Sequence, residues 1–136
     1  MTTKVFDKNL WSEFALPATA SAATTSEALK LTEGLDPEGV NNYAGEFVVT
    51  IPALTATIVP DGKTVTVSVE YSDDDFTNVK ETVTLATLTG ASGVEKTELR
   101  HRVPVTFPGK AIRAKVAFGA DCTDGSALKA VAAWEC

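Results

Sequence analysis

The stretch Thr64–Ser72, with the sequence TVTVSVEYS, alternates between apolar and polar residues along its whole length. The odd-numbered positions are apolar, namely Val65, Val67, Val69 and Tyr71. The even-numbered positions are polar and include Thr64, Thr66, Ser68 and Glu70. Successive side chains of a β-strand point to opposite faces, so the pattern predicts a strand that is buried on one face only. The stretch therefore indicates β-structure at the centre of the chain.

Other parts of the chain repeat this alternation. They are GEFVVTI (45–51), a run that includes Val79, Val83 and Leu85, AIRAKVAF (111–118) and LKAVAAW (128–134). Turn-forming sequences separate the runs, namely Pro60-Asp-Gly62, residues 73–78, residues 89–93, Pro108-Gly109 and Asp124-Gly125. The short spacing predicts an all-β jelly roll or β-sandwich of about eight antiparallel strands, and 136 residues suit a single domain. The last two strands are expected to form a hairpin at Asp124-Gly125.

The N-terminal segment has a different pattern. Its apolar residues recur at near-helical spacing and are Val5, Phe6, Leu10, Trp11 and Phe14. The spacing predicts a short helix or extended arm over residues 1–14, followed by the sandwich domain over residues 15–136. One interpretation is that the segment plugs an end of the sandwich. The other is that it docks on a neighbouring subunit, since Trp and Phe side chains are typical anchors of protein contacts.

The charge of the chain disfavours several kinds of partner. The net charge is -6, with 12 Lys and Arg against 18 Asp and Glu. Nucleic-acid binding requires clustered Lys and Arg, and an acidic chain is repelled by anionic lipid, so we expect neither nucleic acid nor membrane as a partner. No apolar run approaches the roughly 20 residues of a membrane helix, and residues 1–11 lack the apolar core of a secretory signal. We therefore expect synthesis in the cytoplasm.

The two cysteines are predicted to be free thiols. In the expected hairpin, Cys122 lies near the turn and Cys136 at the far end of its strand. Ten strand residues span about 30 Å, whereas a disulfide requires Cα atoms within about 7 Å of each other. Structural zinc requires four Cys or His ligands, and the chain has two Cys and a single His. We expect no metal and no cofactor.

Three consecutive carboxylates, Asp73, Asp74 and Asp75, follow the central strand. A calcium loop places its ligands at alternate positions with a Gly between them, whereas these three are adjacent and precede Phe76. Asp and Ser are common in turns because their side chains bond nearby backbone amides. The stretch is predicted to be a solvated loop tip, with Phe76 folding back toward the core; a bound cation is the alternative.

Catalytic motifs are not evident in the sequence. A nucleophilic triad would have to use His101, which shares the parity of Leu99 and Val103 and is predicted to be a packed residue with one hydrogen bond. Arg100 and Arg102 fall on the polar parity of the same strand, and Pro104 predicts an edge strand because proline cannot donate to a ladder. These two arginines are interpreted either as solvated charges or as residues that contact an acidic partner. We expect no enzymatic activity.

The arrangement resembles the small jelly-roll cement or decoration proteins of tailed bacteriophage capsids. The resemblance rests on four stretches: the Ala/Thr-rich ALPATASAATTSEALKL after the apolar N-terminus, TVTVSVEYSDDDF, VPVTFPGKAIRAKVAF and GADCTDGSALKAVAAW. It covers most of the chain, which departs from the family in its long loop at residues 32–44 and in its two Cys. The resemblance implies a non-enzymatic virion protein that binds the outside of the assembled head, with the major capsid protein and itself, as dimer or trimer, as partners.

The patterns and the resemblance together nominate a set of partner-binding residues. They are Val5, Phe6, Leu10, Trp11 and Phe14 in the N-terminal segment, Asn41, Asn42 and Tyr43 in the long loop, and Arg100 and Arg102 in the edge strand. A second hypothesis is a carbohydrate-binding or adhesive β-sandwich, which predicts an exposed aromatic platform and calcium at residues 73–75. A third, a hydrolase on a jelly roll, would need a pair of carboxylates that no motif singles out.

Overall fold

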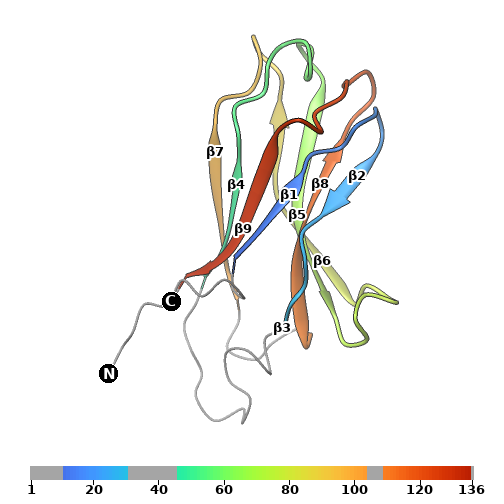
Figure 1. Cartoon of the computed structure of the whole chain (residues 1–136), viewed down its shortest axis with the longest axis vertical. Helices are drawn as coiled ribbons and strands as arrows, with labels where there is room; N and C mark the ends of the chain where they lie inside the picture. Colours follow the sequence, from blue (N-terminus) through green and yellow to red (C-terminus); the bar gives the residue numbers. More distant parts are fainter. Residues whose placement is uncertain (1–10, 31–45, 104–108, 136) are drawn as a thin grey trace.

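The computed structural model describes residues 11–30, 46–103 and 109–135, and these ranges contain β-strands and no helix (Figure 1). The strands are β1 (Trp11–Ala15), β2 (Ala23–Thr25), β3 (Leu29–Lys30), β4 (Glu46–Ile51), β5 (Thr64–Ser72), β6 (Glu81–Thr89), β7 (Thr97–Arg102), β8 (Ala111–Phe118) and β9 (Lys129–Glu135). They form a 4-stranded sheet in the order β1-β9-β4-β7 and a 5-stranded sheet in the order β2-β8-β5-β6, in which β3 also pairs with β8. The all-β sandwich predicted from the sequence is confirmed.

The strands pair in the order typical of a jelly roll. Strand β5 pairs with the next strand, β6; from this hairpin outward, β4 pairs with β7, β2 and β3 with β8, and β1 with β9, all antiparallel. The chain therefore resembles one long antiparallel ribbon that is rolled up. The additional pairs β4–β9 and β5–β8 join the ribbon's layers into the two sheets. Strands β2 and β3 share one partner and act as a single interrupted strand.

Strand β5 lies between β6 and β8, and its apolar face forms the centre of the core. Val65, Val67, Val69 and Tyr71 each have 0% of their surface exposed. The prediction of a solvated opposite face is wrong for its second half, because Ser68, Glu70 and Ser72 are also buried. The side chain of Arg113 on β8 and the loop after Ser72 contact this part of the outer face. The alternation of residues along the strand does not indicate that other parts of the chain contact its outer face.

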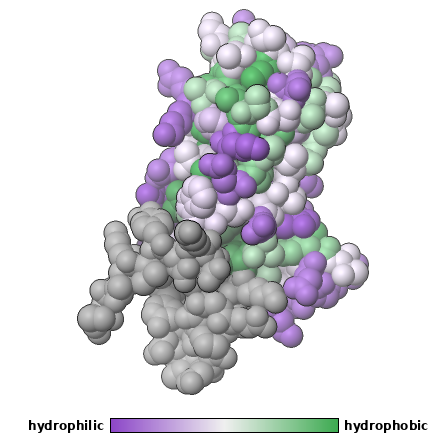
Figure 2. Space-filling view, in the orientation of Figure 1, coloured by the Kyte–Doolittle hydropathy of each residue, from purple (hydrophilic) through white to green (hydrophobic). Residues whose placement is uncertain are grey.

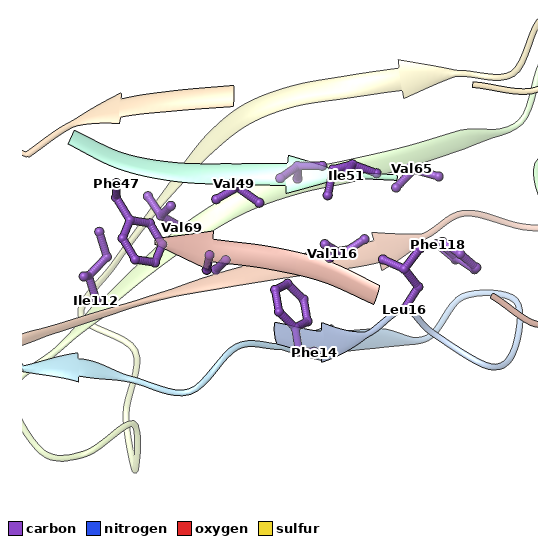
Figure 3. Close-up of a cluster of buried hydrophobic side chains, with 14 of the residues drawn as sticks. Phe14, Leu16, Phe47, Val49, Ile51, Val65, Val69, Ile112, Val116 and Phe118 are labelled. Atoms are coloured by element: carbon purple, nitrogen blue, oxygen red, sulfur yellow. The ribbon is translucent and has the colours of Figure 1, made fainter. Parts of the chain in front are cut away.

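The core fills the space between the two sheets (Figure 3). Figure 3 shows Phe47, Val49 and Ile51 from β4 facing Val65, Val69, Ile112 and Val116 from the other sheet, with Phe14, Leu16 and Phe118 alongside. The C-terminal strand contributes Ala130, Ala132 and Trp134, as its alternation predicts. Most members are β-branched or aromatic, which suits a pleated surface that packs on another sheet.

The N-terminal segment is not a helix where the structure describes it. Trp11–Ala15 is strand β1, which pairs with β9 from Trp11↔Ala133 to Ala15↔Lys129. The predicted boundary after residue 14 is therefore wrong, because it falls inside a strand of the sandwich. Residues three apart share a helix face but lie on opposite faces of a strand. Accordingly Phe14 enters the core, whereas 46% of Trp11 is exposed.

The predicted hairpin of the last two strands is also wrong. Strands β8 and β9 belong to different sheets, so the chain crosses the end of the sandwich between them. Backbone hydrogen bonds from Thr123 N to Ile58 O and from Gly125 N to Pro17 O attach this crossing to two other loops. Cys122, within the crossing, is a buried free thiol, and Cys136 lies outside the described residues. The hairpin argument for separate thiols therefore does not apply.

Two glycine turns lie at the same end of the sandwich as this crossing, next to the start of β5 and the end of β6. Lys63 N donates to Pro60 O at 2.9 Å around Gly62, which has a φ of 80°, as the Pro-Asp-Gly sequence predicts. Gly93 has a φ of 90°, and a Cβ there would lie 2.4 Å from Leu54 O. Only glycine fits this close approach, which allows Leu54 and Val94 to form a two-way backbone bridge.

Candidate interaction surface

The outer surface of the four-stranded sheet, here called the β1–β7 face, brings together several of the predicted contact residues. The alternation that sends Phe14, Phe47 and Trp134 into the core sends the intervening side chains outward. These outward residues are Trp11, Glu13 and Ala15 of β1, Lys129, Val131 and Ala133 of β9, Glu46, Val48 and Thr50 of β4, and Glu98, Arg100 and Arg102 of β7.

One row across this face is mainly apolar. The registers Trp11↔Ala133, Val48↔Ala133 and Val48↔Arg100 place four side chains in line from one sheet edge to the other. The two central ones, Val48 and Ala133, are buried at 7% and 8% exposure, whereas Trp11 at the edge is 46% exposed. A large exposed aromatic beside an apolar row is typical of an anchor in a protein contact.

The β1–β7 face carries charges of both signs, several of them paired. Arg100 Nη2 lies 2.7 Å from Glu98 Oε1, and its Nη1 lies 3.7 Å from Glu46 Oε1. Arg102 is exposed and stands opposite Glu46 in the β4–β7 register. The expected cluster of solvated basic charge is therefore balanced by carboxylates. Such exposed ion pairs contribute little to stability, but their arrangement can select a partner.

Strand β7 is an edge strand, as predicted, because among the described strands it pairs only with β4. The structure therefore places Trp11, Arg100 and Arg102 on one face, while Phe14 is directed into the core. For Phe14, the interpretation as a packing residue fits its position better than that of a surface anchor. The remaining candidates, Val5, Phe6, Leu10, Asn41, Asn42 and Tyr43, and the predicted proline effect at Pro104, lie outside the described residues.

The carboxylates Asp73 and Asp74 bind protein donors. Asp73 accepts hydrogen bonds from Lys80 Nζ at 2.9 Å and from the backbone amide of Lys110 at 3.0 Å. Asp74 accepts hydrogen bonds from the backbone and side-chain amides of Asn78, at 3.0 Å each. Its Oδ1 lies 2.7 Å from the Ser72 hydroxyl. These bonds lower the pKa of Asp73 and hold the pKa of Asp74 at about 2. The residues act as turn formers, as predicted.

The backbone of the same loop forms a tight turn. Thr77 N donates to Asp74 O at 3.2 Å, and the central residues Asp75 and Phe76 have φ values of 56° and 63°. Two positive φ values in succession are the mark of a type I′ turn. Within the described residues, no group of three or more His, Cys, Asp or Glu side chains is placed to hold a metal ion.

An ionic cluster around the buried Glu70 lies beneath this loop. Glu70 Oε1 accepts from Arg113 Nη2 at 2.9 Å, and Lys115 Nζ lies 3.7 Å from Glu70 Oε2. The Arg113 guanidinium in turn stacks over the Phe76 ring, with Cζ 4.1 Å from the ring centroid. Phe76 therefore folds back as expected, but onto the outer face of the sheet rather than into the core. Sequence reasoning missed this cluster because it depends on β5 lying beside β8.

His101 is the packed residue that its parity predicted. Its Nε2 lies 2.6 Å from the Tyr71 hydroxyl, and the two rings meet edge to face with centroids 5.9 Å apart. Burial lowers the pKa of His101, although the nearby Glu81 carboxylate opposes that shift. Burial, together with Glu81, raises the pKa of Tyr71. The pair links β7 to β5 across the sandwich.

The described part of the chain contains no helix with the length and apolar character that a membrane crossing requires. Figure 2 shows hydrophobic and hydrophilic residues interspersed over the visible face of the described part.

Comparison of the sequence with protein-family models and with curated proteins yields no match. The candidate interaction surface is therefore assigned from its geometry alone.

Proposed function

We propose that the protein is a non-enzymatic virion protein, a capsid decoration or cement protein that binds the outer surface of an assembled phage head. In this proposal it acts as a homo-oligomer and stabilises contacts between major capsid subunits. The supporting observation is the β1–β7 face, on which an apolar row runs from the exposed Trp11 at one sheet edge to Arg100, paired with Glu98, at the other. An apolar centre with a polar rim is the usual anatomy of a specific protein contact.

The fold supports the same proposal. A decoration protein must hold its contact residues in fixed positions while the shell bears outward pressure. The β1–β7 face is built on four hydrogen-bonded strands, so Trp11 and Arg100 are positioned by the sheet. Little conformational entropy is then lost when such a surface binds.

Substitution of Trp11 tests the assignment. Trp11→Ala is expected to weaken binding to expanded capsids by roughly 30-fold or more, since a hot-spot anchor contributes at least about 2 kcal/mol. The readout is occupancy per coat subunit after sedimentation over a range of protein concentrations. Val79→Ala is the control, because Val79 is the other large exposed hydrophobic residue among those that the structure describes, and it is not on the β1–β7 face. Unchanged occupancy for Trp11→Ala would remove this face from the proposal.

The arm hypothesis requires a truncation that spares the sandwich. Removal of residues 1–14 deletes most of β1, so loss of binding would only report a damaged fold. Removal of residues 1–10 eliminates Val5, Phe6 and Leu10 and leaves the strand intact. If the arm docks on a neighbour, this shorter truncation abolishes capsid binding while the melting temperature is retained; full occupancy would exclude the arm.

The carbohydrate-binding hypothesis receives less support. Of its aromatic candidates within the described residues, Trp134 is buried and Phe76 is stacked against Arg113, which leaves Trp11 exposed. Asp73 and Asp74 already accept hydrogen bonds from protein donors. We expect millimolar Ca²⁺ to leave the melting temperature unchanged, and a calcium-dependent increase would favour the alternative.

A further inference from the structure

The two sheets have four edges, and three of them carry features that hinder pairing with another chain. One edge consists of β2 and β3, which are 3 and 2 residues long and interrupted. Strand β1 has 5 residues and places the charged Glu13 outward. Strand β7 has 6 residues and carries Glu98, Arg100 and Arg102. Short, interrupted or charged edges are the usual protection against strand addition.

Strand β6 is the exception. It has 9 residues and, within the described residues, pairs only with β5. No charged residue occurs between Thr82 and Thr89, and every outward position in this stretch is a threonine: Thr82, Thr84, Thr87 and Thr89. Its one interruption is a bulge, at which the register with β5 skips Leu85. The segment Ala86–Thr89 beyond the bulge is therefore a regular, uncharged edge of high β-propensity.

The side of the sandwich next to this edge is incompletely covered. Val83, Leu85 and Leu88 of β6 and Leu99 of β7 pack against the core but remain partly exposed. On the opposite side of the sandwich, Phe14, Leu16 and Leu29 are buried at 8%, 1% and 7% exposure. The open edge and this partly exposed apolar strip coincide, so one partner could satisfy the free backbone groups and cover the leucines together.

We propose that the partner is a second copy of this chain, whose β6 pairs antiparallel with this β6 about a twofold axis. With the axis at Thr87, the outward Thr87 faces its counterpart, and Ala86 faces Leu88 of the second copy, so apolar meets apolar. A chain of net charge -6 approaches itself most favourably along an uncharged strand. This inference rests on the proposed function only for the expectation of a homo-oligomer, and it names the element that forms it.

A charge placed on the edge tests the pairing. The purified wild-type chain is expected to have twice its 14.3 kDa mass by light scattering, and Thr87→Lys to have half the wild-type value. Ala23→Lys, which adds the same charge to an exposed position on the opposite edge of the same sheet, should leave the dimer intact. Circular dichroism and the melting temperature show that each variant is folded. A wild-type monomer or trimer, or a folded Thr87→Lys dimer, overturns the proposal.

Cross-linking provides a second test that does not depend on disrupting the interface. In a Cys136→Ser background, Thr87→Cys is expected to form an intermolecular disulfide, because residues that face each other on antiparallel strands have Cα atoms about 4.5–5.5 Å apart. Thr66→Cys is the matched control, since Thr66 pairs with Thr87 one strand further from the axis. Equal cross-linking at both positions contradicts the pairing.

These experiments use the isolated protein, so their outcome is separate from capsid binding. A monomer that still decorates capsids would refute the β6 pairing and leave the proposed capsid binding standing. A β6-paired dimer that does not bind capsids would support the β6 pairing and refute the proposed capsid binding.

Discussion

Glu70 shows at the scale of a single residue how a polar side chain is accommodated on a buried strand. The residue is 5% exposed, and its carboxylate lies between Arg113 at 2.9 Å and Lys115 at 3.7 Å. A buried charge is costly unless paired, and the loss of one partner leaves that cost uncompensated. The two cations are unequal in distance and exposure, so their removal should have unequal effects.

Arg113→Ala is expected to lower the free energy of unfolding by about 2–3 kcal/mol, because it removes the closer ion pair and the Phe76 stack while Lys115 remains. Lys115→Ala is the control and should cost less than about 1 kcal/mol, since this pair is longer and more solvated. Urea denaturation measures both. Equal losses would show that Glu70 does not depend on Arg113.

His101 makes stability depend on pH. Its pKa in the folded protein is lowered from 6.5 by burial, so the unfolded chain takes up the proton first as pH falls. Stability is therefore fully present above pH 6.5 and is lost as pH falls from 6.5 through the folded pKa. His101→Gln, which retains a hydrogen-bonding side chain without titrating, should flatten the unfolding free energy over this window. A wild-type profile that is flat there would contradict the assignment.

At the scale of an element, the β5–β6 hairpin depends on its strained turn. Asp75 and Phe76 adopt positive φ values, but only Phe76 is compensated by a contact, its stack against Arg113. Left-handed backbone costs a non-glycine residue about 1–2 kcal/mol. Asp73 and Asp74, by contrast, fasten the loop through their hydrogen bonds.

Asp75→Gly is therefore expected to raise the free energy of unfolding by roughly 0.5–1 kcal/mol, since glycine adopts this conformation without a Cβ clash. Phe76→Gly relieves the same strain but removes the stack, so it should give no net gain. Chemical denaturation of both variants separates the two contributions. A loss of stability in Asp75→Gly would indicate that the Asp75 side chain has a structural role.

At the scale of the whole molecule, the two ends of the described chain form one strand pair. Strand β1 begins at Trp11 and β9 ends at Glu135, and they are hydrogen-bonded neighbours. The roll therefore closes only when the last strand is in place, and pairings so distant in sequence are slow to form. Trp134, which is 1% exposed, contributes the largest of the fully buried side chains at this closure.

Trp134→Ala is expected to lower the free energy of unfolding by about 3–5 kcal/mol, as for other buried aromatic truncations. The change should appear as a lower denaturation midpoint for the whole domain in a single cooperative transition. Trp11→Ala, on the outside of the same pair of strands, should shift the midpoint little. Independent melting of the C-terminal strand would contradict a closed roll.

Some parts of this structure were predictable from local pattern. Alternation located β4, β5, β8 and β9, and parity correctly assigned Val65, His101 and Trp134 to the inner face. Strand order was less accessible: the turn at Asp124-Gly125 suggested a hairpin, yet β8 and β9 lie in different sheets. The candidate surface could not be predicted from local pattern either, because only the strand register places Trp11 in line with Arg100.

By itself, the sequence determined that the chain forms β-strands, which side chains of most strands enter the core, and where several of the turns occur. These properties depend on two-residue periodicity and on the local conformations of Gly, Pro and Asp, which act over a few residues. Only the tertiary structure decided that Phe14 belongs to a strand, that Glu70 lies buried between two cations, and that Ala86–Thr89 of β6 forms an edge among the described strands. Those features depend on which distant strands become neighbours, and periodicity does not encode that choice.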